Sequence, residues 1–227
     1  RNPRLLSGLR FLLGCSHGVT VHEDSVQRLA RLGDGWEVAT AGRVYRADGV
    51  LVAAGAWSRA LLKPLGIDWP LMPVKGEMLR YPSGVSAPDT ILLSESGYLI
   101  PRADGSLLAG STLEEDVSDL RPSRQAAESL RQVAGELWPP LRGAMPVLQW
   151  AGLRPGIRGD MPLIGPVPDQ PGLFVATGHY RYGLTAGPAT ARLIAALIDG
   201  ETPPLDPVPF APAWPAQSPE PASSSSS

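Results

Sequence analysis

A short apolar run that leads into a glycine-bracketed turn and then a helical pattern is the feature that most constrains this chain. Residues 173–176 are apolar and predict a buried strand. Residues 178–183 begin and end with glycine, and a helical pattern follows from about Pro188 to Asp199. Because glycine lets the backbone approach a ligand closely, such a strand–turn–helix presents N–H groups to a bound molecule. Arg181, in the middle of this turn, is therefore a candidate ligand-binding residue.

A second arginine, Arg154, lies in the glycine-flanked segment 151–156, which we interpret as another turn after a strand at 147–150. A guanidinium group is a planar fork that binds a carboxylate through two parallel hydrogen bonds. Taken singly, each arginine is more often a surface or structural residue, but their shared setting predicts a carboxylate clamp beside a cofactor. Tyr98, at the start of a hairpin strand, either adds a hydroxyl donor to the same carboxylate or packs as a core aromatic.

The length and composition indicate a globular protein. A chain of 227 residues can form one large domain or two small ones, and 43% hydrophobic with 19% charged residues is ordinary for such domains. The net charge of −2 gives no electrostatic basis for binding nucleic acid or an anionic membrane. The apolar run at residues 5–13 is too short and too interrupted for a membrane span, so we expect an amphipathic helix that begins near Pro3.

Other residues that carry chemistry give few signals. The single cysteine, Cys15, excludes an internal disulfide and is typical of a reducing, cytoplasmic compartment. We expect Cys15 to be a small buried hydrophobe rather than a nucleophile. The sequence has no P-loop, zinc-ligand spacing or G-x-S-x-G elbow, and histidines 17, 22 and 179 do not form a metal-like set, so no metal site is predicted. The acidic cluster at residues 114–116 is predicted to be a solvated loop.

The first part of the chain has the pattern of an α/β sheet. A continuous apolar run at residues 49–55 predicts a strand covered on both faces, and Ser58 is expected to cap a helix that extends through Leu65. Further short strands are predicted at residues 18–21, 25–29 and 36–40.

The middle of the chain has a different pattern. Residues 71–150 predict an antiparallel sheet with one helix, which begins near Ser123 and ends near Trp138. Strands are predicted at residues 78–81, 97–102 and 106–110, the last two joined by a turn at 103–105. The final helix is expected to stop at Gly200, and a proline-rich tail at residues 203–227 is predicted to be disordered.

Four segments of the sequence resemble the D-amino-acid oxidase superfamily of flavoenzymes, and within it the glycine oxidases of thiamine biosynthesis. They are residues 50–58 (VLVAAGAWS), 74–77 (VKGE), 150–155 (WAGLRP) and 177–183 (TGHYRYG). The likeness extends from about Pro3 to Pro204. It implies an α/β protein with an α+β substrate domain. A partial FAD-binding domain of the glutathione-reductase type would occupy residues 1–70 and 151–202, and the antiparallel substrate domain residues 71–150.

The resemblance implies FAD as the cofactor, a small amino acid or amine as the substrate and oxygen as the acceptor, and it allows a homo-oligomer. Arg154 and Arg181, with Tyr98 assisting, would bind the substrate carboxylate while a hydride moves from the α-carbon to the flavin. The residues implied to border the cofactor are Val26, Ala54, Gly55, His179, Tyr180, Arg181, Tyr182, Gly183, Leu184 and Thr185.

The chain departs from the superfamily in two places. The N-terminal G-x-G-x-x-G that seats the flavin pyrophosphate is absent, so we expect the C-terminal part of such an enzyme. Tyr182 stands where glycine oxidases carry asparagine, which affects contacts near the flavin. Three hypotheses follow: a glycine-oxidase-like FAD enzyme, a sarcosine oxidase or D-amino-acid dehydrogenase, and a non-catalytic fragment or subunit that needs a partner to hold FAD.

Overall fold

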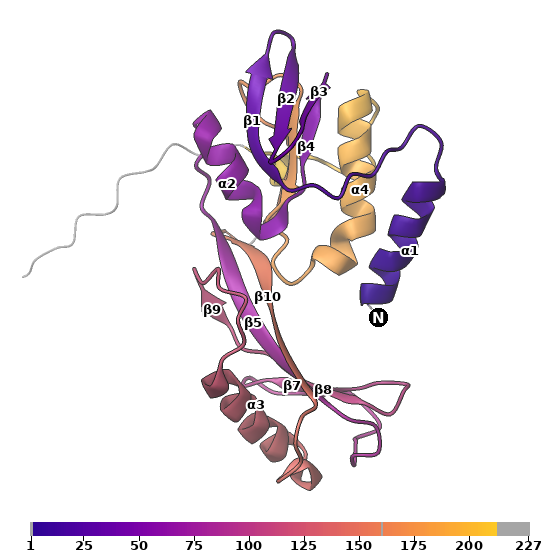
Figure 1. Cartoon of the computed structure of the whole chain (residues 1–227), viewed down its shortest axis with the longest axis vertical. Coiled ribbons are helices and arrows are strands. Elements are labelled where there is room, and N and C mark those ends of the chain that lie inside the picture. The colour runs from indigo at the N-terminus through magenta and orange to yellow at the C-terminus, as the bar shows by residue number, and fades with distance from the viewer. Residues whose placement is uncertain (1, 160, 213–227) are drawn as a thin grey trace, which may run out of the picture.

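The computed structural model describes residues 2–159 and 161–212, and it is a mixed α/β structure built on antiparallel sheets (Figure 1). The helices within these residues are α1 (Asn2–Cys15), α2 (Ser58–Leu62), α3 (Arg124–Leu137) and α4 (Gly183–Asp199). The strands are β1 (Val26–Leu32), β2 (Gly35–Thr40), β3 (Val44–Ala47), β4 (Val50–Val52), β5 (Leu71–Tyr81), β6 (Leu92–Leu93), β7 (Tyr98–Pro101), β8 (Leu107–Gly110), β9 (Glu114–Glu115), β10 (Leu148–Ile157), β11 (Leu163–Pro166) and β12 (Leu173–Thr177).

Two long strands, β5 and β10, join the upper and lower parts of the molecule in Figure 1. They pair antiparallel without a register shift from Leu71 opposite Ile157 to Arg80 opposite Leu148. β10 lies at the edge of a sheet of order β10-β5-β8-β7-β6, and β9 pairs with β5. This sheet is the antiparallel one predicted for the middle of the chain.

Helix α3 covers one face of the six-stranded sheet. Its buried residues Leu130 and Ala134 pack against Leu79, Leu99 and other apolar side chains of β5, β7 and β8. Ser123 caps the helix, because its side chain accepts a 3.1 Å hydrogen bond from the backbone N–H of Ala126. The predicted helix start near Ser123 is therefore confirmed, and the opposite sheet face is left free of α3.

A buried ion pair fixes the beginning of α3 to the sheet. The Lys75 Nζ lies 3.1 Å from the Glu77 Oε1, and both side chains are buried. The Glu77 carboxylate also accepts hydrogen bonds from the Ser123 N–H at 3.0 and 3.1 Å and from the Gln149 amide at 2.7 Å. Burial would raise the pKa of Glu77, but these donors and the Lys75 ammonium outweigh burial and lower the pKa below its ordinary value.

The upper part of the molecule contains two further sheets. β4 runs parallel to β12, which pairs antiparallel with β11, so the first and last thirds of the chain share one sheet. β1, β2 and β3 form a separate antiparallel sheet. A core that includes Trp36, Val52 and Leu173 joins these sheets to α2. The division of the chain into domains at residues 71 and 151 stays a prediction.

The observed elements correct several predictions in the first and last thirds of the chain. Residues 18–21 form no strand, and β4 is only three residues long with Leu51 exposed. Ser58 does not cap α2, because its hydroxyl is buried and donates to Thr177 instead. Helix α4 begins at Gly183 rather than near Pro188, so Pro188 lies inside the helix, where its missing N–H removes one backbone hydrogen bond. Gly200 ends α4 in a left-handed conformation, as predicted.

Other predictions are wrong because a local sequence pattern does not show which segments lie together in the tertiary structure. Cys15 is exposed rather than buried, and the acidic cluster contributes β9, whose two residues pair with Val74 and Lys75. Within the predicted tail, residues 203–212 are ordered in part. A 3₁₀ helix at Val208–Phe210 places Phe210 against α4 and β11. The rest of the predicted tail, residues 213–227, lies outside the described residues.

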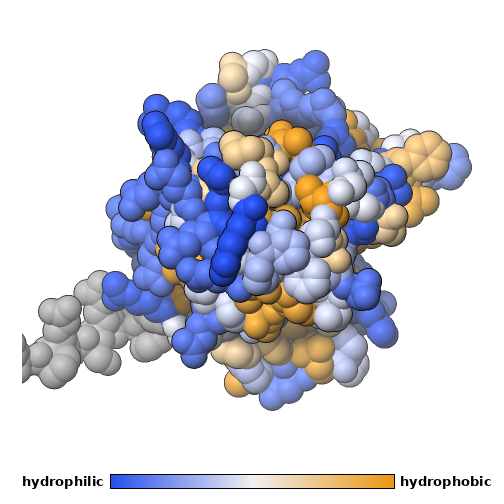
Figure 2. All heavy atoms as spheres, turned by 90° about the horizontal axis from the view of Figure 1, so that it is seen from below, coloured by the Kyte–Doolittle hydropathy of each residue, from blue (hydrophilic) through white to orange (hydrophobic). Residues whose placement is uncertain are grey.

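Figure 2 shows the molecule of Figure 1 from its lower end. Viewed from below, hydrophilic residues cover most of that face, with apolar residues in separate groups between them. Helix α1 is amphipathic in sequence, but it buries no residue in the structure. Among the described residues, no helix has the length and apolar content that crossing a bilayer requires.

Candidate cofactor and substrate site

An apolar groove of about 740 Å³ lies between the start of β1, strand β4 and helix α2. Val26 and Ala54, both predicted to border the adenosine side of a cofactor, line this groove. Leu29, Val50 and Trp57 supply further apolar wall. The groove therefore brings together residues that are distant in the sequence, and its lining suits the apolar body of a nucleotide cofactor.

Buried hydroxyl groups fix the turn that follows the groove. Gly55 adopts a positive φ of 56°, which favours glycine, and its carbonyl oxygen accepts a 3.1 Å hydrogen bond from the Thr177 hydroxyl. The Thr177 oxygen in turn accepts a hydrogen bond of 3.1 Å from Ser58. This chain joins the end of β12 to the Ala54–Gly55 turn, so the groove and the turn after β12 are held as one unit.

The turn after β12 is the one that the sequence marks most clearly. Tyr180 has a positive φ of 49°, and its backbone N–H donates a 2.9 Å hydrogen bond to the carbonyl of Pro155. The Tyr182 N–H donates to the His179 carbonyl at 2.9 Å, which closes the turn. The His179 Nε2 lies 2.9 Å from the Thr190 hydroxyl, and burial lowers the pKa of His179, so a neutral ring is favoured.

Arg181 projects from this turn and is exposed. Its guanidinium carbon lies 5.0 Å from the centre of the Tyr180 ring, and its Nη2 donates to the Tyr180 hydroxyl at 3.3 Å. A cavity of about 260 Å³ is lined by Ile157, Tyr180, Arg181 and Tyr182. The guanidinium therefore borders open space that a small anion can enter.

The beginning of α4 lies directly after the turn. Tyr182 is the residue before the helix, and its side chain makes no capping hydrogen bond to the first turn. Gly183, Leu184 and Thr185 form that first turn and are exposed. Free N–H groups at a helix start favour negative charge, which suits the electron-rich end of a reduced flavin or a phosphate.

Arg154 lies within strand β10 and not in a turn, which corrects the prediction. The glycines on both sides of it pair regularly with β5, so they belong to the strand ladder. The Arg154 Nη2 donates to the Ser111 hydroxyl at 2.8 Å, and its Nη1 donates to the Thr112 carbonyl at 3.4 Å. Arginine has five N–H donors, so donors remain for a ligand.

Tyr98 shares a sheet face with Arg154. Strand pairing aligns Tyr98 with Gly110, Gly110 with Met78, and Met78 with Trp150, and directly paired residues point to the same face. Arg154 follows four residues after Trp150 and therefore lies on that face too. This is the face opposite α3. The Tyr98 hydroxyl lies 3.9 Å from the Met78 sulfur. Met78 belongs to β5, which lies between the strands of Tyr98 and Arg154, the two residues predicted to bind the carboxylate from this sheet.

Arg154, Arg181 and Tyr98 thus lie in neighbouring parts of the structure, but their side chains do not contact one another. The Tyr180–Pro155 hydrogen bond sets the backbones of Arg181 and Arg154 next to each other. Their guanidinium groups have different partners, and Arg154 does not line the Arg181 cavity. Tyr98 lies three strands from β10, which is roughly 14 Å of backbone separation.

Sequence reasoning missed four residues that shape this region. Met78, Ser111, Thr112 and Thr177 contact predicted site residues through their side chains or carbonyls. Each lies far in sequence from the residue it contacts, so no local pattern could identify it. Thr177 does lie in the segment 177–183 and Met78 adjoins the segment 74–77, but the sequence offered no such signal for Ser111 and Thr112.

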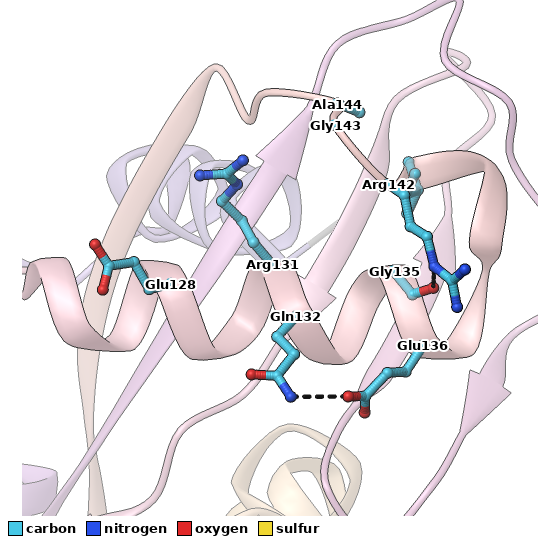
Figure 3. Close-up of a pocket in the computed structure, with 9 residues that line it drawn as sticks. Glu128, Arg131, Gln132, Gly135, Glu136, Arg142, Gly143 and Ala144 are labelled. Carbon is cyan, nitrogen blue, oxygen red and sulfur yellow. Dashed lines mark hydrogen bonds between the residues drawn. The ribbon is translucent and has the colours of Figure 1, made fainter.

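A separate hollow of about 470 Å³ lies over the outer side of α3. Figure 3 shows its lining, which comes from α3 and the turn after it; Gln132 donates to Glu136 at 2.9 Å and Arg142 donates to the Gly135 carbonyl at 3.3 Å. None of the predicted site residues lies here. These pairs are ordinary surface contacts, so the hollow is not part of the candidate site.

The fold and these contacts define a class of protein: an α/β nucleotide-cofactor unit joined by two long strands to an antiparallel sheet that carries an arginine on its open face. The chain belongs to the DAO family of FAD-dependent oxidoreductases, whose family model matches residues 2–197. The resemblance to this group, predicted from four short segments, is confirmed.

Individual relatives agree with the family. A glycine oxidase from Pseudomonas aeruginosa is 48% identical over 216 residues, which are 94% of this chain and 59% of that protein. The crystal structure of glycine oxidase from Geobacillus kaustophilus matches with a TM-score of 0.82 at 31% identity, over 88% of this chain and 54% of that chain. Iminodiacetate oxidase from Chelativorans sp. BNC1 matches with a TM-score of 0.81 at 29% identity, over 92% of this chain and 58% of that chain. The chain thus spans somewhat more than half the length of these relatives.

Proposed function

We propose that this chain forms the substrate-binding and flavin-covering part of an FAD-dependent oxidase that deaminates glycine or another small amino acid. The observation that carries the proposal is the adjacency of Arg154 and Arg181 at the Tyr180–Pro155 hydrogen bond, beside an open sheet face. The 48% identity to a glycine oxidase over 94% of the chain supports the same substrate class. A place in thiamine biosynthesis belongs to this proposal as well.

In this proposal the two arginines bind the substrate carboxylate. Arg154 offers its remaining donors from the sheet, and Arg181 offers a second fork from the turn. Tyr98 and Met78 lie on the same sheet face and limit the space on the far side of the substrate. Held at its carboxylate, a small amino acid has only one face of its α-carbon directed toward the cofactor, which is the positional contribution that a flavoenzyme requires.

The residues present fit FAD. The apolar groove at Val26 and Ala54 suits the adenosine part, and the turn at residues 178–182 with the uncapped start of α4 suits the ring system. The flavin, when bound, supplies the hydride-accepting chemistry. Burial lowers the pKa of His179, which favours the uncharged ring, and its contact with Thr190 fixes the ring beside the turn.

The test is glycine oxidation by the full-length protein that contains these residues, measured as oxygen uptake and ammonia release. Arg181→Ala is expected to raise KM for glycine by about tenfold to hundredfold, because a charged hydrogen-bond partner of the carboxylate is lost. Normal KM and kcat in this variant would remove the carboxylate assignment. Sarcosine and D-alanine in the same assay, with artificial electron acceptors replacing oxygen, separate an oxidase for glycine from a sarcosine oxidase or a D-amino-acid dehydrogenase.

A secondary amine is the second candidate substrate. The similarity to iminodiacetate oxidase, whose name denotes an N-substituted glycine, favours it. The third reading, a non-catalytic fragment or subunit, is tested on the isolated chain. We expect the isolated chain to bind FAD weakly, since its sequence lacks a pyrophosphate-binding fingerprint. A yellow purified chain with a flavin absorbance band would contradict that expectation.

A further inference from the structure

We propose that Gly76 and Ser111 are positioning residues that hold the Arg154 guanidinium on the open face of the six-stranded sheet. The inference rests on the proposed function, because it explains how one of the two carboxylate-binding arginines is placed. Neither residue was identified as part of a site by sequence reasoning. Both contact Arg154 from strands or segments that lie far from it in the sequence.

Gly76 provides the space in which the guanidinium lies. A Cβ atom added at Gly76 would lie 2.2 Å from the Arg154 Nη1, 2.4 Å from its Nη2 and 2.5 Å from its Cζ. These separations are far below van der Waals contact, so any side chain at this position displaces the guanidinium. Gly76 pairs regularly with Gly152 in the β5–β10 ladder, so its backbone does not itself require glycine. The requirement comes from the arginine.

Ser111 and Thr112 provide the hydrogen bonds that fix the guanidinium over Gly76. The Ser111 hydroxyl accepts from Nη2 at 2.8 Å, and the Thr112 carbonyl accepts from Nη1 at 3.4 Å. Thr112 is itself bound to β5, because its hydroxyl accepts from the Glu77 N–H at 2.9 Å and its N–H donates to the Glu77 carbonyl at 3.3 Å. We call Gly76, Ser111 and Thr112 the seat of Arg154. The seat is attached to β5, the same strand that supplies Gly76.

Gly152 shows that the close approach is specific to Gly76. It lies directly opposite Gly76 and on the same sheet face, yet a Cβ atom added there would meet no atom within 4 Å. The space beside the guanidinium is thus open while the space beneath it is filled. An arginine supported from below and open at its side is prearranged to receive a carboxylate, which reduces the entropy lost on binding.

Kinetics of the full-length protein test the seat. Gly76→Ala and Ser111→Ala are each expected to raise KM for glycine by about tenfold with a smaller fall in kcat, because a charge-assisted contact is misplaced. Ser111→Thr keeps the hydroxyl, so this variant is expected to have a KM for glycine close to that of the unaltered protein. Gly42→Ala is the matched control because, in contrast to Gly76, a Cβ atom added at Gly42 would meet no atom within 4 Å, and the residue lies in the turn between β2 and β3. An unchanged KM in both alanine variants overturns the proposal.

Modification of Arg154 by phenylglyoxal, followed by peptide mapping, gives a readout that does not depend on turnover. In the unaltered protein Arg154 is expected to react more slowly than the exposed Arg181. Gly76→Ala and Ser111→Ala are expected to accelerate the reaction at Arg154, whereas Gly42→Ala leaves it unchanged. An accelerated reaction in a protein that oxidises no amine would uphold the seat and reject the proposed function. An unchanged reaction at Arg154 rejects the seat, and Ser111→Ala decides this if Gly76→Ala does not fold.

Discussion

The backbone N–H of Tyr180 donates a 2.9 Å hydrogen bond to the carbonyl oxygen of Pro155. This contact joins the turn after β12 to the edge strand β10. Arg181 directly follows Tyr180 in the sequence, and Arg154 directly precedes Pro155. The backbones of two arginines from different segments of the chain are thereby placed next to each other. The carboxylate-binding proposal depends on this relationship.

The first prediction concerns coupling between the two arginines. If Arg154 and Arg181 bind one carboxylate, Arg154→Lys and Arg181→Lys should each raise KM for glycine by about tenfold, because lysine keeps the charge but loses the fork. The double variant should lose less than the sum of the two free-energy changes, since the carboxylate is already poorly held after the first substitution. Steady-state kinetics of all four proteins measure the coupling. Strict additivity would indicate that the arginines act on different groups.

The second prediction concerns the buried hydroxyl chain. Thr177→Val removes the donor to the Gly55 carbonyl and the acceptor for Ser58, so it should destabilise the fold by about 1–3 kcal/mol. It should also weaken FAD binding, because the Ala54–Gly55 turn borders the apolar groove. Urea unfolding and FAD titration measure the two effects. Thr202→Val, at an exposed position, is the control and should leave both quantities unchanged.

The third prediction concerns the buried Lys75–Glu77 pair. Lys75→Met leaves the Glu77 carboxylate buried without its ammonium partner, which should lower the free energy of unfolding by about 3–5 kcal/mol. Lys63→Met is the matched control, since Lys63 lies 3.7 Å from Asp68 on the surface and should contribute no more than about 1 kcal/mol. Equal unfolding midpoints for the two variants in urea would show that the buried pair does not anchor α3.

The fourth prediction is the pH dependence of the same site. The folded state lowers the pKa of Glu77, so the folded protein favours the charged carboxylate more than the unfolded chain does. The resulting stabilisation is complete above the unfolded pKa of about 4.3 and is lost as the pH falls through the lowered folded pKa. Unfolding of Glu77→Gln should therefore lack part of the acid-induced destabilisation seen in the unaltered protein. The exposed Glu95→Gln is the control, and a Glu77→Gln curve parallel to the unaltered one would contradict the assignment.

The sequence determined the local elements whose signals are contained in neighbouring residues. The β7–β8 hairpin, the start of α3 near Ser123 and the stop of α4 at Gly200 follow from local sequence signals, and all three are observed. The glycine-bracketed turn that carries Arg181 could be located in the same way. The family could also be identified from the sequence, because each of the segments that resemble it is a short run of contiguous residues.

Only the tertiary structure decided how these parts meet. The glycines around Arg154 look like turn residues in the sequence, but pairing with β5 makes them a strand, since long-range hydrogen bonds can override local preference. Likewise, no pattern could show that Gly76 leaves room for a guanidinium or that Ser111 binds it, because the three residues lie on separate segments. Strand register alone placed Tyr98, Met78 and Arg154 on one face of the sheet.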